Sequence, residues 1–425
     1  MAYPRNVRNR YKQAAAELRA PFWDWAATSA VPPATVPAFV AINTPKGRAQ
    51  VRNPLSGYVY PPAAFSGEFG NFRPEFGPTI LHCPAPNRYP QSANALLRAA
   101  NLKEQVYNSF VYSQSFEDFS STGGNGISIE QVHNTIHRES ACGEQFSEQD
   151  VAGFDPLFML HHANVDRLWA FWEVIRPNLA SFRRPYAGHS RFTTPAGTII
   201  RPNSPLQPFF APRGVPHTSD SVVSFRKFGY SYPGLEDGGS QEEQRHHAIR
   251  HMRELYGETQ DAPRHASRQI FMAHMNINVE DIPFRPAQIH VFLCGRHAGS
   301  IPVLSKPSHG RLHGTVPLSK AIKECRRLGR DPRKHTGLRI IGPGNREIPI
   351  SSIRSLTMEL EDFKATPPSS DEELPALGPR HRVPVDMEQS HAPIETEYEE
   401  SDGNSGGAGD ETSDESGGYQ QDDDY

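Results

Sequence analysis

The sequence predicts a mainly α-helical domain, then a small β-rich domain, then a disordered acidic tail. Apolar side chains recur every three or four residues over 93–110, 128–138 and 156–175, which is the period of a helix. Between about residues 269 and 361, short runs such as "QIHVFLCG" and "LRIIG" are bounded by Gly and Pro and favour strands. Residues 393–425 hold twelve Asp or Glu and no Lys or Arg, a composition typical of disorder.

These patterns divide the chain into four parts. Residues 1–235 form the helical domain, 236–268 a linker with a polar helix, 269–362 the β-rich domain, and 363–425 a disordered Pro-rich and acidic tail. Within the first part, a further helix is expected over 5–27, and residues 31–90 and 176–235 are rich in Pro and read as long loops. The Pro-rich stretch 364–384 is predicted to be a linker.

Composition excludes several functions. No apolar run approaches the ~20 residues of a membrane span, so no membrane partner is expected. The chain carries a net charge of −4, and the part before the acidic tail is basic at +8. That part has no basic stripe interleaved with aromatic residues, which argues against nucleic acid, and the tail itself is expected to be solubilising.

The four cysteines lie far apart and show no paired spacing. The start of the chain, "MAYPRNVRNRYKQAAAEL", has no apolar segment of the secretory type. Together these features predict reduced thiols and a cytoplasmic protein.

Two histidines in "SIEQVHNTIH" could be metal ligands. Ser128 followed three residues later by Gln131 predicts the start of a helix. His133 and His137 are four residues apart, so both imidazoles leave one face of that helix. The spacing alone is a modest signal, because His247 and His251 share it in the charged helix 240–257, where they are expected to be solvated.

The stretch "FDPLFMLHHANVDRLWAFWE" supplies a third candidate ligand. Asp155 and Pro156 predict the start of a helix that places His162 on one face with Phe158 and Asp166. Asp166 could orient a ligand or a neighbouring Arg. Three imidazoles from two helices suit copper, zinc or iron, although unmetallated core histidines also fit the pattern.

Zinc chemistry is only partly excluded. The zinc-protease motif needs Glu directly after its first His, and Asn134 stands in that place. A zinc hydrolase with three histidines remains open on ligand count alone.

With these motifs the chain resembles a fungal-type tyrosinase. "HNTIH" followed by "FDPLFMLHHANVDRLWAFW" is similar to the copper B half of that family, and "APFWDWA" to the Trp-Asp-Trp segment that follows the copper A half. "FGYSYPG" resembles the Tyr-x-Tyr stretch that closes the catalytic domain, and "HVFLCG", "GSIPVLS" and "GTVPLSKAI" resemble the C-terminal lid domain. The resemblance therefore implies a di-copper four-helix-bundle fold with a lid over residues 1–360.

The resemblance assigns roles around the copper B site. It implies that His133, His137 and His162 bind copper, and that His161 is a neighbour in the second shell rather than a ligand. Glu130 and Asn134 would hold a catalytic water that takes the phenol proton. Arg138 would help orient the substrate and Phe158 would line the substrate slot, while Asp166 is expected in the second shell.

The resemblance also implies a reaction. Phenols would be oxidised to o-quinones with dioxygen, in pigment or secondary-metabolite synthesis, on a small phenolic substrate. The family's copper A ligands precede the Trp-Asp-Trp segment, and the chain has no His before His82, so the domain is expected to be N-terminally incomplete and its second copper is doubtful. The alternative is a non-catalytic homologue that binds one copper or none. The exposed apolar face that would result leaves a homo-oligomer open.

Overall fold

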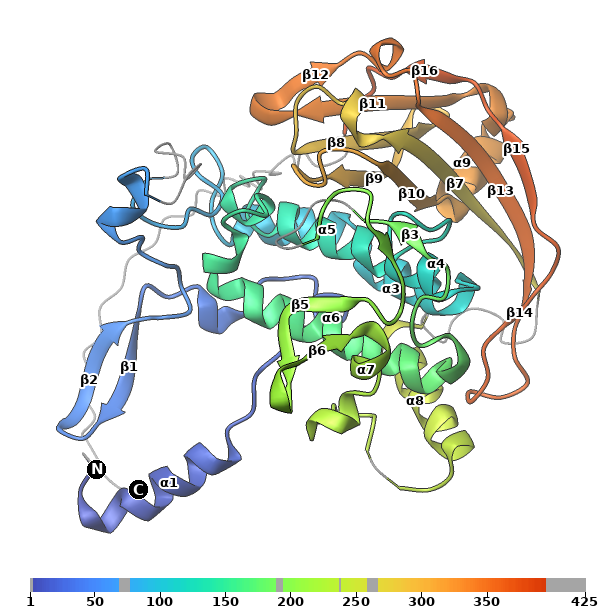
Figure 1. Ribbon diagram of the computed structural model, residues 1–425. Helices are drawn as coiled ribbons and strands as arrows, with labels where there is room; N and C mark the ends of the chain where they lie inside the picture. Colours follow the sequence, from blue (N-terminus) through green and yellow to red (C-terminus); the bar gives the residue numbers. More distant parts are fainter. Residues whose placement is uncertain (1–2, 69–76, 189–193, 237, 258–266, 395–425) are drawn as a thin grey trace, which may run out of the picture.

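The computed structural model describes residues 3–68, 77–188, 194–236, 238–257 and 267–394. A helical domain lies below a β-rich domain in Figure 1, with the short helix α1 at the far end of the molecule. In the described part of the chain, no helix is long and apolar enough to cross a membrane. The predicted order of a helical and then a β-rich domain is confirmed.

The helical domain is built around two long helices at its centre. Its helices are α2 (Gln91–Ala99), α3 (Leu102–Tyr112), α4 (Phe116–Ser120), α5 (Ile129–Glu139), α6 (Pro156–Ile175), α7 (Ser219–Val222) and α8 (Gln241–Tyr256). The single helix expected over 93–110 is two helices, because Asn101 adopts the left-handed conformation with φ 51° and breaks the hydrogen-bond ladder.

Helix α6 anchors the core of this domain. Asp155 caps its first turn by accepting a hydrogen bond from the backbone N–H of Leu157, as the sequence predicts. Trp172, which is fully buried, stacks on Phe119 with 4.1 Å between ring centroids, and Phe110 packs beside both rings. Burying such large aromatic groups supplies much of the stabilisation of this domain.

Helix α8 is not the solvated linker helix that the sequence predicts. Ser240 and Glu243 form a capping box at its start. Its apolar residues Ala248, Ile249, Met252 and Tyr256 are buried, and the helix packs against α6 and α3. The correction has a simple cause: these residues recur at helical spacing, but the charged residues between them hide the stripe in a reading of composition.

The N-terminal region carries less regular structure than expected. Helix α1 spans Arg5–Glu17, ends ten residues before the predicted boundary, and buries no residue. The chain then runs extended through "PFWDW" and buries Trp23 and Trp25. Regions predicted to be loops hold three small hairpins, formed by β1 (Phe39–Thr44) with β2 (Gly47–Arg52), β3 (Tyr186–Ala187) with β4 (Ile199–Ile200), and β5 (Pro205–Ala211) with β6 (Val215–Thr218).

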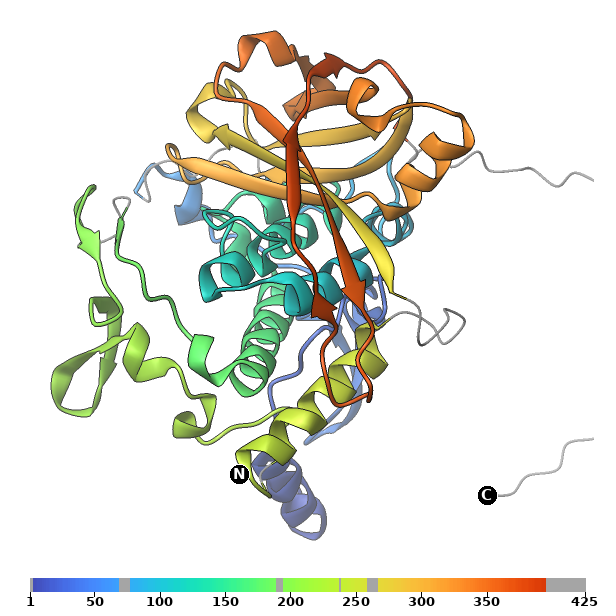
Figure 2. The same cartoon turned by 90° about the vertical axis from the view of Figure 1, so that its right-hand side faces the viewer.

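The β-rich domain consists of two sheets that enclose its own core (Figure 2). One sheet has the order β10-β7-β13-β14 with β15 paired to β13, and the other has the order β12-β11-β8-β9 with β16 paired in parallel to β11. The strands are β7 (Arg268–Asn278), β8 (Ala287–Leu293), β9 (Arg296–Val303), β10 (Arg311–Pro317), β11 (Thr336–Gly342), β12 (Arg346–Ile348), β13 (Thr357–Thr366), β14 (Ala376–Leu377), β15 (His381–Pro384) and β16 (Met387–Gln389), and helix α9 (Ser319–Arg327) packs beside β7 and β9.

The prediction that 363–425 is disordered, with a linker at 364–384, is wrong for its first part. Strands β14 and β15 pair with β13, and β16 adds to the second sheet. The carboxylate of Glu361 accepts from the Arg382 guanidinium at 2.8 Å, which ties β15 to the buried side of β13. Pro-rich, polar sequence conceals these edge strands because their partners lie far away in the chain. The rest of the predicted tail, 395–425, lies outside the described residues.

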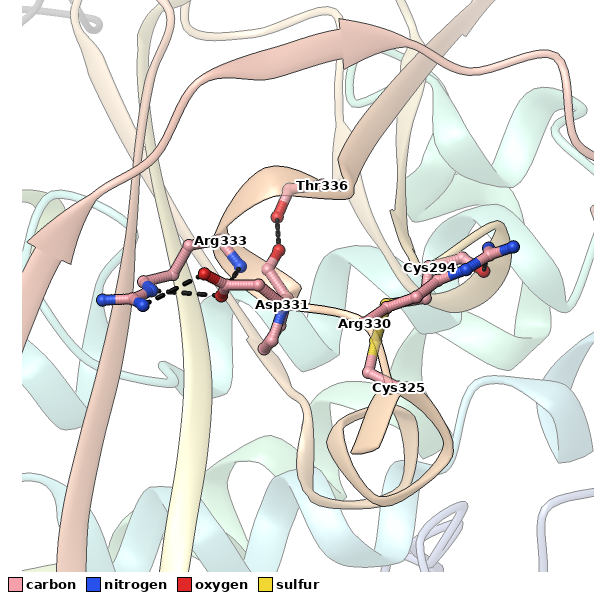
Figure 3. Close-up of a disulfide and its surroundings, with 7 residues drawn as sticks. Cys294, Cys325, Arg330, Asp331, Arg333 and Thr336 are labelled. Atoms are coloured by element: carbon pink, nitrogen blue, oxygen red, sulfur yellow. Dashed lines mark hydrogen bonds and ion pairs between the residues drawn. A yellow bond between two sulfur atoms is a disulfide. The ribbon is translucent and has the colours of Figure 1, made fainter. Parts of the chain in front are cut away.

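The expectation of four reduced thiols is also wrong. Cys83 is bonded to Cys142, and Cys294 to Cys325, with sequence separations of 59 and 31 residues. Figure 3 shows the second bridge, which joins the end of β8 to helix α9. Pairing at such distances depends on which segments the fold brings together, so no spacing pattern in the sequence reveals it.

The two domains meet across helix α5. Gln131 accepts from the backbone N–H of Thr315 at 2.8 Å and donates to its carbonyl oxygen at 2.9 Å. Gln288 of β8 donates to the buried carboxylate of Glu139 at 2.7 Å. The β-rich domain is therefore hydrogen-bonded to the helix that carries the first two candidate metal ligands.

Candidate metal centre

Helices α5 and α6 bring three predicted ligands together. The Nε2 atom of His133 lies 3.1 Å from Nε2 of His137 and 3.3 Å from Nε2 of His162. With His161 these residues form the metal-compatible cluster found among the described residues, with candidate ligand atoms all within 4.8 Å of one another. The sequence placed the three side chains on two helix faces, and the packing of α5 on α6 makes those faces meet.

The spacing of the three Nε2 atoms fits a bound metal ion. Metal–imidazole bonds are ~2.0–2.1 Å long, so two nitrogens on one tetrahedral ion lie about 3.4 Å apart. The observed separations of 3.1 and 3.3 Å are close to that value. Neutral imidazole nitrogens suit copper, zinc and iron, so the site fits the copper that the sequence motifs imply.

Hydrogen bonds fix the nitrogen that each α5 histidine presents. Nδ1 of His137 lies 2.7 Å from the carbonyl oxygen of Phe146, which only accepts, so Nδ1 carries the proton. Nδ1 of His133 likewise lies 2.9 Å from Oδ1 of Asn134. Both Nε2 atoms therefore keep a free lone pair directed at the shared point, the arrangement that metal-binding histidines require.

Burial keeps the imidazoles neutral. Desolvation lowers the pKa of His133 to about 4, although the hydrogen bond that its Nδ1–H donates to Asn134 opposes the shift. Desolvation and the neighbouring His133 lower the pKa of His162 to about 4, and burial lowers that of His137 well below its ordinary value. At neutral pH no proton has to leave before a metal ion binds.

His161 lies in the same cluster with a different geometry. Its ring stacks on that of His133 with a centroid distance of 4.8 Å and an interplanar angle of 24°. Two rings stacked face to face cannot direct their lone pairs at one ion. His161 is fully buried beside Trp25, and neither ring nitrogen has a hydrogen-bond partner among the described residues. Its place in the second shell stays a prediction.

The two predicted catalytic residues lie one turn apart on α5 and make separate contacts. Glu130 accepts from the backbone N–H of Thr122 at 2.7 Å and from its hydroxyl at 3.0 Å. Asn134 orients His133 through Oδ1. The structure therefore gives Asn134 a positioning role that the sequence did not reveal, while their joint hold on a catalytic water stays a prediction.

Phe158 and Arg138 lie on different sides of the centre. Phe158 stacks on His162 with 4.1 Å between ring centroids, so it can line a slot beside the metal. Arg138 lines a cavity of about 250 Å³ between the domains, together with Glu139 and His290, and its predicted role in orienting the substrate stays a prediction. The physical reason for this position is its place one residue after His137, which turns the side chain about 100° around the helix toward the β-rich domain.

Asp166 does not contact a metal ligand in the described structure. It accepts hydrogen bonds from the hydroxyl groups of Tyr232 at 2.6 Å and Tyr230 at 2.8 Å. These are the two tyrosines of "FGYSYPG", so Asp166 fastens that segment to α6. Burial and this carboxylate raise the pKa of both phenols.

Sequence reasoning missed a buried polar network behind the centre. Arg167, next to Asp166, donates to the carboxylate of Asp24 at 3.1 Å and to the hydroxyl of Tyr256 at 2.8 Å. The same Tyr256 hydroxyl donates to Asp24 at 2.8 Å. The network joins the segment "PFWDW" to helices α6 and α8. The sequence did contain a signal for it, because Asp24 and Arg167 are charged residues that lie inside strongly apolar motifs.

Sequence reasoning also missed a second buried polar contact. Nε2 of His82 lies 2.6 Å from the carboxylate of Asp155, the residue that caps α6, and its ring stacks on Tyr89. The sequence gives no local signal for this contact, because His82 and Asp155 lie 73 residues apart. The pair ties the segment before α2 to the start of the helix that carries His162.

Comparison with known proteins gives a consistent family relationship. Residues 1–175 match the model of the common central domain of tyrosinase. The tyrosinase of Podospora anserina is 33% identical over 255 residues, covering 54% of this chain and 44% of that protein. The tyrosinase of Neurospora crassa is 32% identical over 252 residues, covering 53% of this chain and 36% of that protein. The chain thus spans less than half the length of these curated relatives.

Solved structures agree at the level of the fold. The structure of recombinant mushroom tyrosinase superposes with a TM-score of 0.77 at 20% identity and covers 92% of this chain and 80% of that one. An apo-protyrosinase from Aspergillus oryzae gives a TM-score of 0.70 at 16% identity. Residues 1–175 therefore match the central domain of tyrosinase, and the chain has the fold of a fungal-type tyrosinase.

Proposed function

We propose that this protein is a tyrosinase-like copper oxidoreductase that oxidises phenols or catechols to o-quinones with dioxygen. The observation that carries the proposal is the meeting of three neutral imidazole Nε2 atoms at 3.1 and 3.3 Å on two adjoining helices. The match of residues 1–175 to the central domain of tyrosinase makes copper the metal to expect. A small phenolic metabolite in pigment or secondary-metabolite synthesis is the proposed substrate.

The residues of the chain would divide the work. His133, His137 and His162 would hold copper, which supplies one-electron redox chemistry toward dioxygen when bound. Phe158 offers an aromatic face beside His162 against which a phenol ring can stack. Glu130 and Asn134 are proposed to hold a water that accepts the phenol proton, since a carboxylate and an amide one turn apart can fix one water between them.

Copper content tests the metal site directly. Elemental analysis of copper-loaded protein should show at least one copper per chain, and His162→Ala should lose the copper of this site. His247→Ala is the matched control, because His247 has the same four-residue spacing to His251 but is itself exposed, so its loss should leave the copper content unchanged. Equal copper content in all three proteins would place the metal elsewhere.

Oxygen uptake with catechol tests the reaction. The copper-loaded protein should consume dioxygen and form an o-quinone, seen by its visible absorbance, and His162→Ala should do neither. Two coppers per chain would support the full reaction of the family.

A non-catalytic homologue that binds one copper or none is the second candidate. It is supported by the single imidazole cluster found in the described residues. Copper that binds and is lost in His162→Ala, without oxygen uptake on any phenol, would favour this candidate over the enzyme.

The cytoplasmic location stays a prediction. It was based partly on the expectation of reduced thiols. That expectation is wrong, because the four cysteines form two disulfide bonds. Disulfides are typical of oxidising compartments. Fractionation of the native source would decide the matter.

A further inference from the structure

The β-rich domain carries a strongly basic surface that the proposed chemistry does not use. It is formed by helix α9 and the short 3₁₀ helix after it, Pro332–Lys334. We call it the basic patch and define it by seven exposed cations: Lys320, Lys323, Arg326, Arg327, Arg330, Arg333 and Lys334. The same stretch, 319–335, holds two carboxylates, so its net charge is +5.

The fold holds these charges outward on a fixed support. Ile322 and Cys325 form the buried face of α9, and the disulfide from Cys325 to Cys294 pins that face to the end of β8 (Figure 3). Arg330 donates to the carbonyl oxygen of Cys294 at 3.4 Å. The Thr336 hydroxyl donates to the carbonyl oxygen of Pro332 at 2.9 Å and fastens the second half of the patch to β11.

Most of this charge has no counter-charge in the described structure. Glu324 forms ion pairs with Arg327 at 2.7 Å and with Arg296 at 3.5 Å. Asp331 forms an ion pair with Arg333 at 3.0 Å. In the described part of the chain, the remaining five cations of the patch make no ion pair with a carboxylate: Lys320, Lys323, Arg326, Arg330 and Lys334. Five like charges between residues 320 and 334 attract any anionic chain within reach.

The chain itself supplies such an anionic partner. Residues 395–425 carry twelve carboxylates and no Lys or Arg. The described chain ends at Ile394, four residues after Ser390, whose backbone N–H donates to the carbonyl oxygen of Leu338 in β11. The acidic tail therefore starts from the sheet whose strand β11 follows directly on the basic patch.

The tail is long enough to reach the patch. The seven residues of β11 span about 23 Å at ~3.3 Å per residue. A flexible chain of the tail's length has a root-mean-square extension of about 30 Å. Tethering at this distance gives an effective concentration in the mM range, so even weak charge pairing would be largely intramolecular.

We propose that the acidic tail, residues 395–425, docks on the basic patch of its own chain. Docking neutralises the patch and shields it from other polyanions. Several carboxylates of the tail would interact with several cations of the patch, without one fixed geometry. Because salt screens such charges, the affinity should fall steeply as the salt concentration rises. It does not depend on copper or on oxidase activity, so its failure would leave the proposed function untouched.

The test uses the full chain and a fluorescent peptide of residues 395–425, with binding followed by anisotropy. The probed protein carries amides in place of all twelve tail carboxylates, Asp→Asn and Glu→Gln, so that its own tail cannot compete. At low salt it should bind the peptide at least 10-fold more tightly than the unaltered chain does. Binding should fall at least 10-fold between 20 and 200 mM salt, as expected for a multi-charge contact.

Charge reversal locates the surface. Lys320→Glu, Lys323→Glu and Lys334→Glu together, in the tail-amide protein, should weaken peptide binding at least 10-fold. The matched control is Arg5→Glu, Arg10→Glu and Lys12→Glu, which reverses three exposed cations of α1 at the opposite end of the molecule (Figures 1 and 2). The control should change the affinity less than twofold.

Three outcomes would overturn the proposal. Equal losses in both triple variants would show attraction to net charge and not to the patch. Equal peptide binding by the unaltered and tail-amide proteins would show that the tail does not occupy the patch in its own chain. If the unaltered protein bound anionic vesicles as tightly as the tail-amide protein does, the tail would not cover the patch. That result would point to a membrane surface as the occupant.

Discussion

At the metal centre, single hydrogen bonds decide how each histidine can act. Phe146 and Asn134 accept from Nδ1 of the two α5 histidines and so leave Nε2 free. The sequence indicated which histidines share a helix face, because that depends only on spacing. It did not indicate the tautomers, because the carbonyl oxygen of Phe146 comes from a loop nine residues away from His137.

Asn134→Leu should weaken copper binding while the helix stays folded. Without the amide oxygen, the imidazole of His133 loses the partner that fixes its proton on Nδ1, and such losses typically cost 10- to 100-fold in metal affinity. Titration against a competing chelator measures the effect. Thr135→Val, which removes a hydroxyl bonded only to the carbonyl of Gln131 in the same helix, should leave the affinity unchanged.

At the scale of elements, α8 shows how a charged helix can belong to a core. Its four buried side chains pack on α6 and α3, and Tyr256 reaches the ion pair of Arg167 with Asp24. The predicted linker at 236–268 therefore contains a structural helix of the helical domain. A pattern of five apolar residues among eleven polar ones predicts a solvated surface, and only the partner helix shows otherwise.

Tyr256→Phe should lower the free energy of unfolding by about 1–3 kcal/mol. The change keeps the ring but leaves Asp24 and Arg167 with a buried hydrogen-bonding position unfilled, and such losses carry that cost. Chemical denaturation measures it. Tyr58→Phe is the control, since Tyr58 is 38% exposed and keeps its ring contacts, so a similar loss there would remove the explanation.

The bridge between β8 and α9 should stabilise the β-rich domain. Replacing Cys294 and Cys325 together by Ala opens a loop of 31 residues, for which chain entropy predicts a loss of about 4 kcal/mol. Thermal unfolding of the variant against the oxidised parent measures the loss. A thiol titration of the denatured parent that finds four free thiols would show that the bridges do not form in the protein as isolated.

At the scale of the whole molecule, the β-rich domain packs against helix α5 and also contains several buried histidines. Burial lowers the pKa of His290 and of His313 to about 3. His313 lies against His274 and Thr315, and the nearby carboxylate of Glu361 bonds to His274. In the folded protein, His290 and His313 therefore stay neutral over the pH range in which they would be protonated in the unfolded chain.

Acid should therefore destabilise the protein with a slope that these histidines set. Their pKa values are lower in the folded state than the unfolded value of about 6.5, so the stability is complete above pH 6.5 and is lost as pH falls toward 3. Each histidine contributes about 1.4 kcal/mol per pH unit within that window. His313→Gln should reduce the slope by one proton in denaturation of the metal-free protein at pH 6, 5 and 4.

A buried residue that does not titrate gives the control for this slope. Leu312→Ala should lower the stability equally at each pH and leave the slope as it is in the parent, because Leu312 is buried in the β-rich domain and carries no ionisable group. A slope that is unchanged in His313→Gln would show that His313 is not kept neutral by the fold.

Sequence alone determined the features that depend on near neighbours along the chain. The cap of α5 at Ser128, the cap of α6 at Asp155, the shared face of His133 and His137, and the change from helices to strands near residue 269 all follow from spacing and local hydrogen bonding. The motifs built on them were specific enough to indicate the resemblance to tyrosinases that the comparisons then confirmed.

Only the tertiary structure decided the features that join distant segments. It paired the cysteines across 59 and 31 residues, added β14, β15 and β16 to the sheets, turned Arg138 toward the β-rich domain, and gave Asp166 two tyrosines as partners. The reason is physical: each of these contacts gains its energy from a partner far away in the chain, and a local pattern carries no record of which segments the folded core brings together.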